Sequence, residues 1–383
     1  MNNKLIIAAA GAGKTSYIVD AACAIPSGNV LILTYTIANE NEIRNRFFEK
    51  NGGIPKRVTI QTWFSFLLQH GVRPYQDTLK TELFDKHIGF FLSPQASGVK
   101  IKAGGSLRYN IYYAEDAEFL KHYFTSDMKI FSDKISKFVC RTDQESQGLV
   151  FCRIKEIFQH IFIDEVQDLA GYDLDIVKSL CASVESTLLV GDPRQVAYLT
   201  HNEKKYAQYA EGKIQEYIRD KFGRRIPCEV DNTSLRYSHR NNSAICEFSS
   251  RLFPNFPSSI SCNCANCRTA ITEHLGIFAL SEDHVELYIK KYSPLQLTWD
   301  QTVNCSSSAP RMNLGESKGL SHDRVLIYPT KEMSKWLRDN TNDLEYRTRA
   351  RLYIGITRAR YSVAFVLDRR QVNNISNIEI WAP

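Results

Sequence analysis

The chain has 383 residues, 43% of them hydrophobic and 23% charged, and a net charge of +6; a chain of this length and composition is expected to be a globular protein with two domains. Its apolar runs are too short for a membrane span or a signal peptide, and ten scattered cysteines do not make a disulfide framework, so we expect a cytoplasmic protein without a membrane partner. The mildly basic charge permits a nucleic-acid partner without requiring one.

Short apolar strands alternate with helices in the first half of the chain. The predicted strands and helices lie at residues 4–10, 16–24, 30–34, 58–60, 63–70, 160–163 and 187–190. Such alternation predicts an α/β fold with an open parallel sheet and right-handed crossovers. Residues 74–147 are polar and aromatic-rich and interrupt the alternation, which indicates an inserted subdomain.

A stretch rich in lysine and arginine, near residues 204–225, precedes a second α/β unit. The strands and helices predicted there lie at residues 241–253, 325–328, 345–354 and 362–367. Residues 254–309 are rich in serine, asparagine and cysteine, so we expect them to be loop-like.

A glycine-rich turn follows the first predicted strand and leads into a helix. It consists of Gly11, Ala12, Gly13, Lys14 and Thr15. Backbone N–H groups in such a turn can bind phosphates, a lysine can reach the β- and γ-phosphates, and a threonine hydroxyl can bind Mg²⁺. The alternative is a strand–helix turn that binds no ligand.

An acidic cluster, DEVQD, follows the predicted strand at residues 160–163. Asp164 would lie at the carboxyl end of that strand, where an open parallel sheet binds its ligand. There it would hold Mg²⁺, and Glu165 would orient and deprotonate the attacking water. The alternative is an acidic surface turn, which the upstream phosphate loop disfavours.

Together these segments resemble the boxes of UvrD/Rep/PcrA-type superfamily 1 DNA helicases. The resemblance rests on AAAGAGKT (8–15), LTYT (33–36), TWF (62–64), DEVQD (164–168), GDPRQ (191–195), SHR (238–240), SKGL (317–320) and YIGITRA (353–359). The boxes occur in the family's order. The resemblance implies two RecA-like domains with ATP and Mg²⁺ bound between them.

The first RecA-like domain would span residues 1–205 with an insert at about 72–150, and the second residues 206–383 with a reduced insert at about 255–310. Such short inserts resemble the helicase subunits of bacterial anti-phage systems such as Gabija, which act with a nuclease partner.

The resemblance also assigns catalytic roles. Gln195 would sense the γ-phosphate, and Arg240 and Arg358 would act as arginine fingers that complete the charge around it. His239 occupies the place of the family's adenine-stacking tyrosine. A buried arginine in a salt bridge is the alternative for either finger.

Nucleic-acid contacts follow from the same resemblance. Tyr35 stands where the family has a base-stacking phenylalanine, with a core tyrosine as the alternative. Thr36 and Thr62 either donate to phosphates or cap helices. Trp63 and Phe64 are successive residues that cannot both face the core, so one of them is a candidate for the path of the strand.

One base-stacking tryptophan of the family is Thr200 here, and Tyr198 and Tyr206 are the alternative candidate substitutes. The expected function is an ATP- and Mg²⁺-dependent single-stranded DNA translocase or helicase, with 3′-to-5′ polarity implied by the resemblance. One alternative is an ATP-gated regulatory subunit of a nuclease or defence complex that does not unwind DNA alone. The other is a scaffold with an inactive site, which the intact Lys14 and Glu165 disfavour.

Cys262, Cys264 and Cys267 form the one local cluster of cysteines. With His274 or Cys305 as a further ligand they could bind structural zinc. Reduced thiols in a loop are the alternative, because the C-x-C spacing is unusual for zinc.

Overall fold

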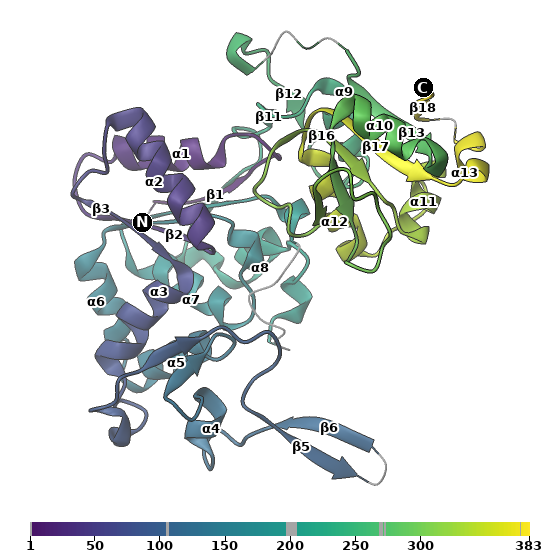
Figure 1. Cartoon of the computed structure of the whole chain (residues 1–383). Coiled ribbons are helices and arrows are strands. Elements are labelled where there is room, and N and C mark those ends of the chain that lie inside the picture. The colour runs from purple at the N-terminus through teal and green to yellow at the C-terminus, as the bar shows by residue number, and fades with distance from the viewer. Residues whose placement is uncertain (1, 105–106, 197–204, 268–270, 272, 376) are drawn as a thin grey trace. The chain divides into compact units, whose positions relative to one another are not determined.

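The computed structural model describes residues 2–104, 107–196, 205–267, 271, 273–375 and 377–383 (Figure 1). The chain divides into two compact units. The first unit comprises the described residues within Met1–Leu5, Thr15–Val190 and Leu199–Val230, and the second those within Ile6–Lys14, Gly191–Tyr198 and Asp231–Pro383. The segment from Ile6 to Lys14 therefore belongs to the same unit as the C-terminal part of the chain, and Thr15 to the other.

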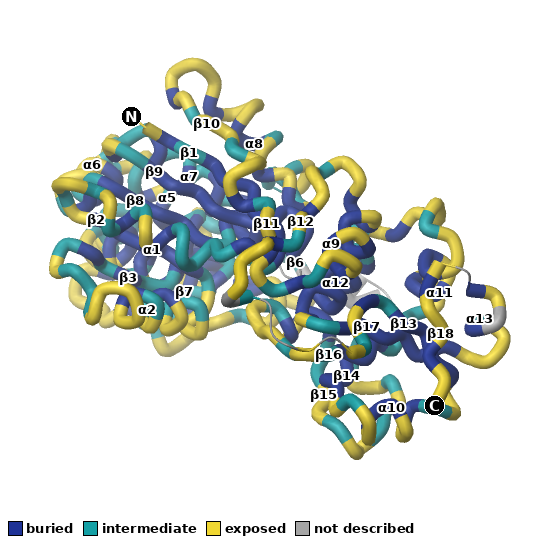
Figure 2. Tube along the Cα trace, turned by 90° about the horizontal axis from the view of Figure 1, so that it is seen from above, coloured by how far each residue is buried: buried dark blue, intermediate teal, exposed yellow. Residues whose placement is uncertain are grey.

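A six-stranded sheet with the order β10-β1-β9-β8-β2-β3 organises the first unit. Its strands are β1 (Asn2–Ile7), β2 (Val30–Thr34), β3 (Val58–Thr62), β8 (His160–Ile163), β9 (Ser186–Gly191) and β10 (Cys228–Asp231). β2 pairs in parallel with β3 and β8, and β8 with β9. Every residue of β2 and β8 is buried, which explains their continuous apolar sequences (Figure 2).

Helices accompany this sheet, and smaller elements fill the chain between β3 and β8. The helices are α1 (Lys14–Ala24), α2 (Ile37–Asn51), α3 (Trp63–Phe66), α4 (Phe119–Tyr123), α5 (Ile135–Glu145), α6 (Leu149–Ile157), α7 (Tyr172–Ser183) and α8 (Ile214–Lys221). β4 (Gly89–Phe91) pairs in parallel with β7 (Lys129–Phe131). β5 (Val99–Gly104) and β6 (Leu107–Tyr112) form an antiparallel hairpin that projects from the first unit in Figure 1.

A second sheet, with the order β15-β14-β16-β17-β13-β18, organises the second unit, and each of its pairings is parallel. Its strands are β13 (Gly276–Ser281), β14 (Leu295–Thr298), β15 (Arg311–Asn313), β16 (His322–Ile327), β17 (Ala359–Leu367) and β18 (Glu379–Ile380). The helices are α9 (Ser243–Ser250), α10 (Val285–Tyr292), α11 (Lys331–Arg338), α12 (Tyr346–Thr357) and α13 (Arg369–Asn373).

Side chains of β17 alternate between two cores in the second unit. Val363 and Phe365 pack in one core with residues of α9, α11 and α12, and Ala364 and Val366 pack in the other with residues of α10. This period-2 pattern places helices on both faces of the sheet, as expected for a parallel sheet. The predicted α/β class with two parallel sheets is confirmed.

The loop expected at residues 254–309 is a wrong prediction over much of its length. β13, α10 and β14 lie within it, and β13 pairs with β17 in the interior of the sheet. The physical reason is that six apolar-rich residues, GIFALS, form a central strand even though the flanking segments are polar. Among the helices of the described residues, none combines the length and apolar character needed to cross a bilayer.

Candidate functional site

The glycine-rich turn has a backbone shape that a phosphate group can fit. Gly11 and Gly13 have φ values of 71° and 81°, in the left-handed region that favours glycine. The N–H of Ala12 donates to the carbonyl of Ala9 at 3.2 Å, and α1 begins at Lys14. The first N–H groups of an α-helix have no intrahelical partner, so the end of this turn can bind an anion. The turn therefore fits the predicted phosphate loop.

The SHR segment packs directly against this loop within the second unit. The N–H of His239 donates to the carbonyl of Gly11 at 2.9 Å. A Cβ added at Gly11 would lie 2.7 Å from the Cβ of Arg240 and 2.8 Å from the Oγ of Ser238. Position 11 therefore has no room for a side chain, and the predicted finger Arg240 begins beside the loop.

The second predicted finger, Arg358, is buried next to the predicted γ-phosphate sensor. Its Nη2 donates to the Oε1 of Gln195 at 3.1 Å, and its Nη1 donates to the carbonyl of Leu320 at 3.2 Å. The side chain is 1% exposed. The Nη1 of Arg240 donates to the carbonyl of Thr357, the residue before Arg358, at 3.2 Å. Carbonyl and amide oxygens of the second unit thus contribute to the orientation of both guanidinium groups.

A buried ion pair orients the GDPRQ turn that carries Gln195. The Nε of Arg194 lies 2.7 Å from an oxygen of Asp192, and both side chains are almost completely buried. Burial alone would lower the pKa of Arg194, but the adjacent Asp192 carboxylate more than offsets this and raises it. Arg194 also donates to the carbonyl of Ala8 at 2.8 Å, and Gln195 donates to Asp192 at 2.7 Å. Sequence reasoning assigned no role to Asp192 or Arg194, although both lie inside a recognised box.

In the first unit, the acidic box follows β8 as predicted. The side chain of Asp164 is 6% exposed, and its N–H donates to the carbonyl of Leu33 in β2 at 2.8 Å. Glu165 has a φ of 54°, which is uncommon for a residue with a side chain, and it accepts a hydrogen bond from the amide of Gln167. Such local strain is typical of functional sites.

Thr15, predicted as a ligand of Mg²⁺, is the second residue of α1 and the first residue of that helix that belongs to the first unit. Its hydroxyl donates to the Oε1 of Glu42 in α2 at 3.2 Å. Thr15 and Asp164 belong to the same unit, and their hydroxyl and carboxylate oxygens are the donors that Mg²⁺ prefers. The residues present therefore fit the predicted metal.

The pair Trp63 and Phe64 does not behave as predicted, because both rings are buried, at 1% and 8% exposure. Trp63 donates its Nε1 to Asp173 at 2.8 Å, so its ring is not available to stack on a base in this arrangement. Tyr35 is half-buried, and its ring centroid is 5.5 Å from that of Phe64. Phe64 in turn lies 4.9 Å from Phe90 of β4.

The two threonines cap helices. Thr36 accepts from the N–H of Asn39 at the start of α2, and Thr62 accepts from the N–H of Ser65 at the start of α3. The hydroxyl of Thr62 also bonds to the Oγ of Ser65 at 2.8 Å. The capping alternative is therefore observed, and contact with phosphate stays a proposal for the exposed Thr36. Tyr198 and Thr200 lie outside the described residues.

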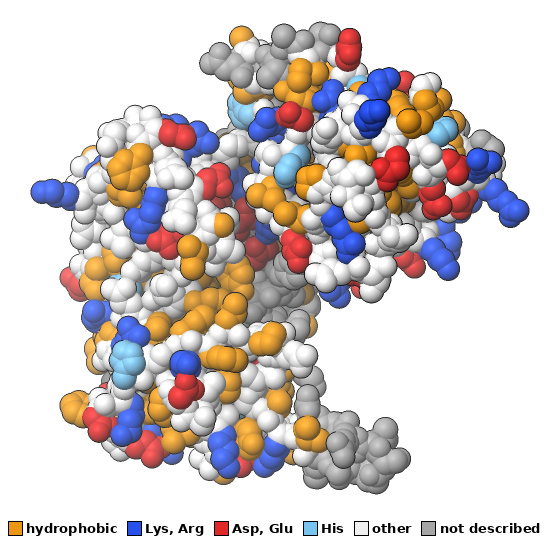
Figure 3. Space-filling view, viewed as in Figure 1, with side chains coloured by type: hydrophobic (Ala, Val, Ile, Leu, Met, Phe, Trp, Pro, Cys, Tyr) orange, Lys and Arg blue, Asp and Glu red, His pale blue; other side chains and the backbone are white. Residues whose placement is uncertain are grey.

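Apolar side chains are exposed near the predicted nucleic-acid residues. Ile37 in α2 is 71% exposed, and Phe91 at the end of β4 is 42% exposed. Figure 3 shows apolar side chains gathered on the visible face of the first unit. An exposed aromatic ring such as that of Phe91 can stack with an unpaired base.

The cysteine cluster lies in the second unit and includes a residue that the sequence did not connect with it. One ligand atom each from Cys262, Cys264, Cys267 and His239 lies within 4.8 Å of every other. The two further ligands considered from sequence are elsewhere. His274 stacks on Phe278 and Tyr292, and Cys305 lies 3.6 Å from a guanidinium nitrogen of Arg311.

His239 faces both the thiols and the phosphate loop. A Cβ added at Gly13 would lie 3.9 Å from the Cδ2 of His239, and Nδ1, on the opposite edge of the ring, is 3.4 Å from the Sγ of Cys267. Its predicted stacking on adenine stays a prediction.

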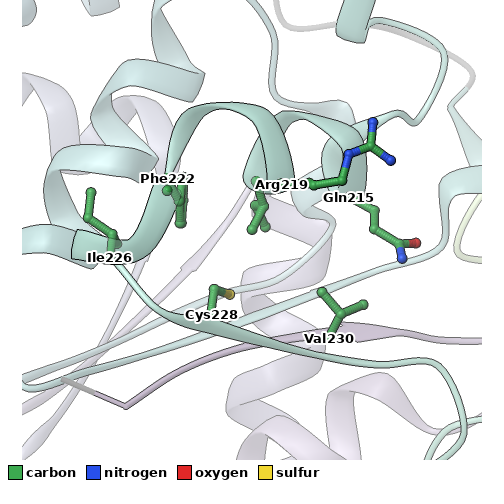
Figure 4. A pocket seen from close by; sticks show the side chains of 8 residues that line it. Gln215, Arg219, Phe222, Ile226, Cys228 and Val230 are labelled. Carbon is green, nitrogen blue, oxygen red and sulfur yellow. The ribbon is translucent and has the colours of Figure 1, made fainter.

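A pocket of about 340 Å³ lies between α8 and β10 in the first unit (Figure 4). Arg219, Phe222 and Val230 are among its lining residues, and none of the predicted site residues is. The lining combines apolar side chains with the polar Gln215 and Arg219, and no chemistry predicted from the sequence is placed there.

Comparison with known families gives a match over part of the chain. The model of the UvrD/REP helicase N-terminal domain matches residues 99–200, which is less than half of the chain. The matched stretch contains the DEVQD and GDPRQ boxes and does not include the phosphate loop or the TRA box. No curated protein matches the sequence.

Three solved structures have a related arrangement over most of this chain. They are a PRRSV helicase (14% identity, TM-score 0.43, 98% of this chain and 54% of that one), an arterivirus nonstructural protein 10 helicase (12%, 0.44, 98% and 62%), and a complex of arterivirus nonstructural protein 10 with DNA (12%, 0.46, 96% and 60%). The chain thus spans less than two thirds of these relatives' length.

Proposed function

We propose that this chain is a nucleic-acid motor of the UvrD type that hydrolyses ATP with Mg²⁺ and translocates along single-stranded DNA. One observation carries the proposal: the phosphate loop and the GDPRQ, SHR and YIGITRA boxes, which are far apart in sequence, gather in the second unit. Arg240 begins beside Gly11, and Arg358 bonds to Gln195. A glycine-rich loop, a polar sensor and two oriented guanidinium groups are what phosphoryl transfer requires.

The roles of the residues follow from their chemistry. Gly11, Ala12 and Gly13 would bind the phosphates through backbone N–H groups, and Lys14 would neutralise them. Thr15 and Asp164 would hold Mg²⁺, which would neutralise phosphate charge when bound.

Glu165 would orient the attacking water and accept its proton. The fingers Arg240 and Arg358 would stabilise the charge that develops as the phosphate bond breaks.

Residues 1–205 and 206–383 would form the two RecA-like domains, and 3′-to-5′ polarity is part of the same proposal. The nucleic-acid path would use Tyr35 and Thr36 in the first unit, with Tyr198 as a further contact. A cytoplasmic location and a role in antiviral defence beside a nuclease are the broader biological proposal. They rest on the resemblance to short anti-phage helicase subunits.

A second candidate is an ATP-gated regulatory subunit that binds nucleic acid and does not unwind it alone. The burial of Trp63 favours this candidate, because it removes one predicted base-stacking ring. A chain that binds single-stranded DNA more weakly would need a partner protein to unwind a duplex.

ATP turnover with and without single-stranded DNA tests the proposal. We expect stimulation by single-stranded DNA that falls steeply with salt, since phosphate contacts release counterions. A parallel series with single-stranded RNA separates the two nucleic acids. Turnover that neither nucleic acid changes would contradict a motor function, and absence of turnover in Mg²⁺ would contradict the enzyme.

A further inference from the structure

Four potential metal ligands from two separate segments meet beside the phosphate loop. The Nδ1 of His239 is 3.4 Å from the Sγ of Cys267 and 3.8 Å from the Sγ of Cys264, and Cys262 completes the group within 4.8 Å. Zinc bound tetrahedrally at about 2.3 Å from each thiolate would place two sulfurs roughly 3.8 Å apart. The four ligand atoms are therefore almost at the spacing that a single ion requires.

Backbone hydrogen bonds, and not the side chains alone, bring the two segments together. β11 (Tyr237–Ser238) pairs in parallel with β12 (Ile260–Ser261), and the N–H of Cys262 donates to the carbonyl of Ser238 at 3.0 Å. The N–H of Cys267 donates to the carbonyl of Cys264 at 3.1 Å, which closes a tight turn. The chain therefore presents a C-x-x-C turn opposite a histidine, which is a common arrangement of structural zinc ligands.

Several residues of the segment around these cysteines are exposed. Cys262 is buried, whereas Ile260, Asn263 and Ala265 are exposed, so the segment contributes little to an apolar core. Fixing each residue costs about 1–2 kcal/mol of backbone entropy. A structural metal supplies folding free energy where a core cannot. Three thiols and an imidazole suit zinc and contain none of the carboxylates that Mg²⁺ or Ca²⁺ prefers.

We propose that His239, Cys262, Cys264 and Cys267 bind one structural Zn²⁺, and that this ion fixes the SHR segment against the phosphate loop. The N–H of His239 donates to the carbonyl of Gly11, and Arg240 follows directly in the chain. An ion on Nδ1 therefore holds the residue that contacts the loop on one side and precedes a predicted finger on the other. Zinc binding itself does not depend on the proposed hydrolysis of ATP.

Metal analysis of the purified full chain tests the site without reference to ATP. We expect one zinc per chain, and loss of zinc from Cys264→Ser, Cys267→Ser and His239→Ala. His239→Cys should keep the ion, because it restores a fourth ligand. Cys305→Ser is the matched control, since Cys305 is a partly buried cysteine outside the cluster and should leave zinc unchanged.

Replacement of zinc by Co²⁺ checks the geometry, because tetrahedral cobalt with thiolate ligands has strong visible and charge-transfer bands. These bands should appear for the wild-type chain and for Cys305→Ser. A chain without zinc and without cobalt bands would overturn the site, as would an iron–sulfur chromophore. Zinc that is lost from Cys305→Ser, or kept in Cys264→Ser, would overturn this ligand set.

Hydrogen exchange tests the link to the loop. With zinc bound, amides of residues 10–14 and 238–241 should exchange more slowly than after chelation, while amides of β3, at the edge of the first sheet, should not change. The chain could bind zinc and yet show, in each of these two segments, the same exchange rate before and after chelation. That result would retain the metal site and contradict its role beside the phosphate loop. This outcome is distinct from failure of ATP hydrolysis, because no nucleotide is present.

Discussion

Glu165 has a backbone conformation that costs on the order of 1–3 kcal/mol for a residue with a side chain, and its φ is 54°. The acidic box holds it there through the hydrogen bond from Gln167. The carboxylate is thereby fixed after the end of β8 and next to the buried Asp164. A carboxylate held in this way agrees with the proposed role of Glu165 in orienting the attacking water.

Glu165→Gln should keep nucleotide binding and stop turnover, because the amide has nearly the same shape but cannot accept the proton of water. Lys14→Ala should instead lose nucleotide binding, since the phosphates lose a cation. Equilibrium binding of a fluorescent ATP analogue and phosphate release measured on both variants separate the two effects. Hydrolysis at the wild-type rate by Glu165→Gln would show that another group activates the water.

Arg358→Ala should slow hydrolysis at least about a hundredfold with only a modest loss of ATP binding, because a finger acts mainly on the transition state. Arg358→Lys should also be slow, since lysine keeps the charge but not the forked geometry that bonds to Gln195 and Leu320. Thermal unfolding of both variants controls for structural damage to this buried position. Rapid turnover by a folded Arg358→Ala chain would make the arginine structural.

His274 should make the fold sensitive to acid. Burial first, and then the charges of Arg324 and Lys291, lower its pKa from 6.5 to about 4. Below pH 6.5 the unfolded chain takes up a proton that the folded chain does not bind, so stability is lost as pH falls from 6.5 towards 4.

Urea unfolding at pH 7 and pH 5 measures this loss, which should be smaller for His274→Phe. His70 remains in that variant with a pKa also lowered to about 4, mainly by burial, so some sensitivity should persist. An unchanged difference between the two pH values in His274→Phe would show that His274 does not contribute.

Sequence patterns identified the chemistry of most residues but not their surroundings. Trp63 and Phe64 were expected to face different environments, and both are buried because Trp63 packs towards Asp173 and Phe64 towards Tyr35 and Phe90. Phe90, in the chain inserted after β3, packs on Phe64. His239 was assigned from its box alone, because its proximity to cysteines more than twenty positions later depends on the pairing of β11 with β12.

At the scale of elements, periodicity located the strands that are buried on both faces. β2 and β8 match their predicted bounds, and their uniform burial produces the uninterrupted apolar sequence that made them recognisable. β14 was missed because its four residues, LQLT, alternate between apolar and polar side chains and are flanked by polar segments. The side-chain amide of the buried Gln296 in that strand donates to the backbone carbonyls of Ser306 and Ala309. No local sequence pattern predicts these hydrogen bonds.

The GDPRQ turn depends on the ion pair between Asp192 and Arg194. Asp192→Asn should destabilise the second unit by about 3–5 kcal/mol, because it leaves a buried guanidinium without its compensating charge. Denaturant unfolding of the variant measures this cost.

The matched control is Asp283→Asn, which breaks an exposed pair with Arg369 and should leave the midpoint unchanged. Equal midpoints for Asp192→Asn and the wild type would show that water or another group satisfies Arg194.

At the scale of the whole molecule, unwinding needs an element that separates the strands of a duplex. The hairpin of β5 and β6 is a candidate within the first insert, and a hydrogen bond from Tyr113 to Gly98 at 2.8 Å closes its base. We expect the chain alone to hydrolyse ATP with single-stranded DNA but to open long duplexes poorly. Replacing residues 99–112 with a short glycine–serine linker should abolish opening of short duplexes and leave stimulated ATP hydrolysis intact.

Strand separation on a 3′-tailed duplex, measured beside ATP turnover, checks both parts of this prediction. Fast and processive opening by the chain alone would contradict a need for a partner. Opening that survives removal of the hairpin would assign strand separation to another element.

Gly11 and Gly52 show why similar backbone angles do not imply similar evolutionary freedom. Their φ values are 71° and 70°, yet a Cβ at Gly52 would meet no atom within 4 Å, whereas one at Gly11 would collide with Arg240 and Ser238. Asparagine, which tolerates this conformation, can drift into position 52 across a lineage. At position 11 any lineage that gains a side chain must first move a second segment of the chain. Which residues position 11 can accept during evolution therefore depends on substitutions more than two hundred positions away.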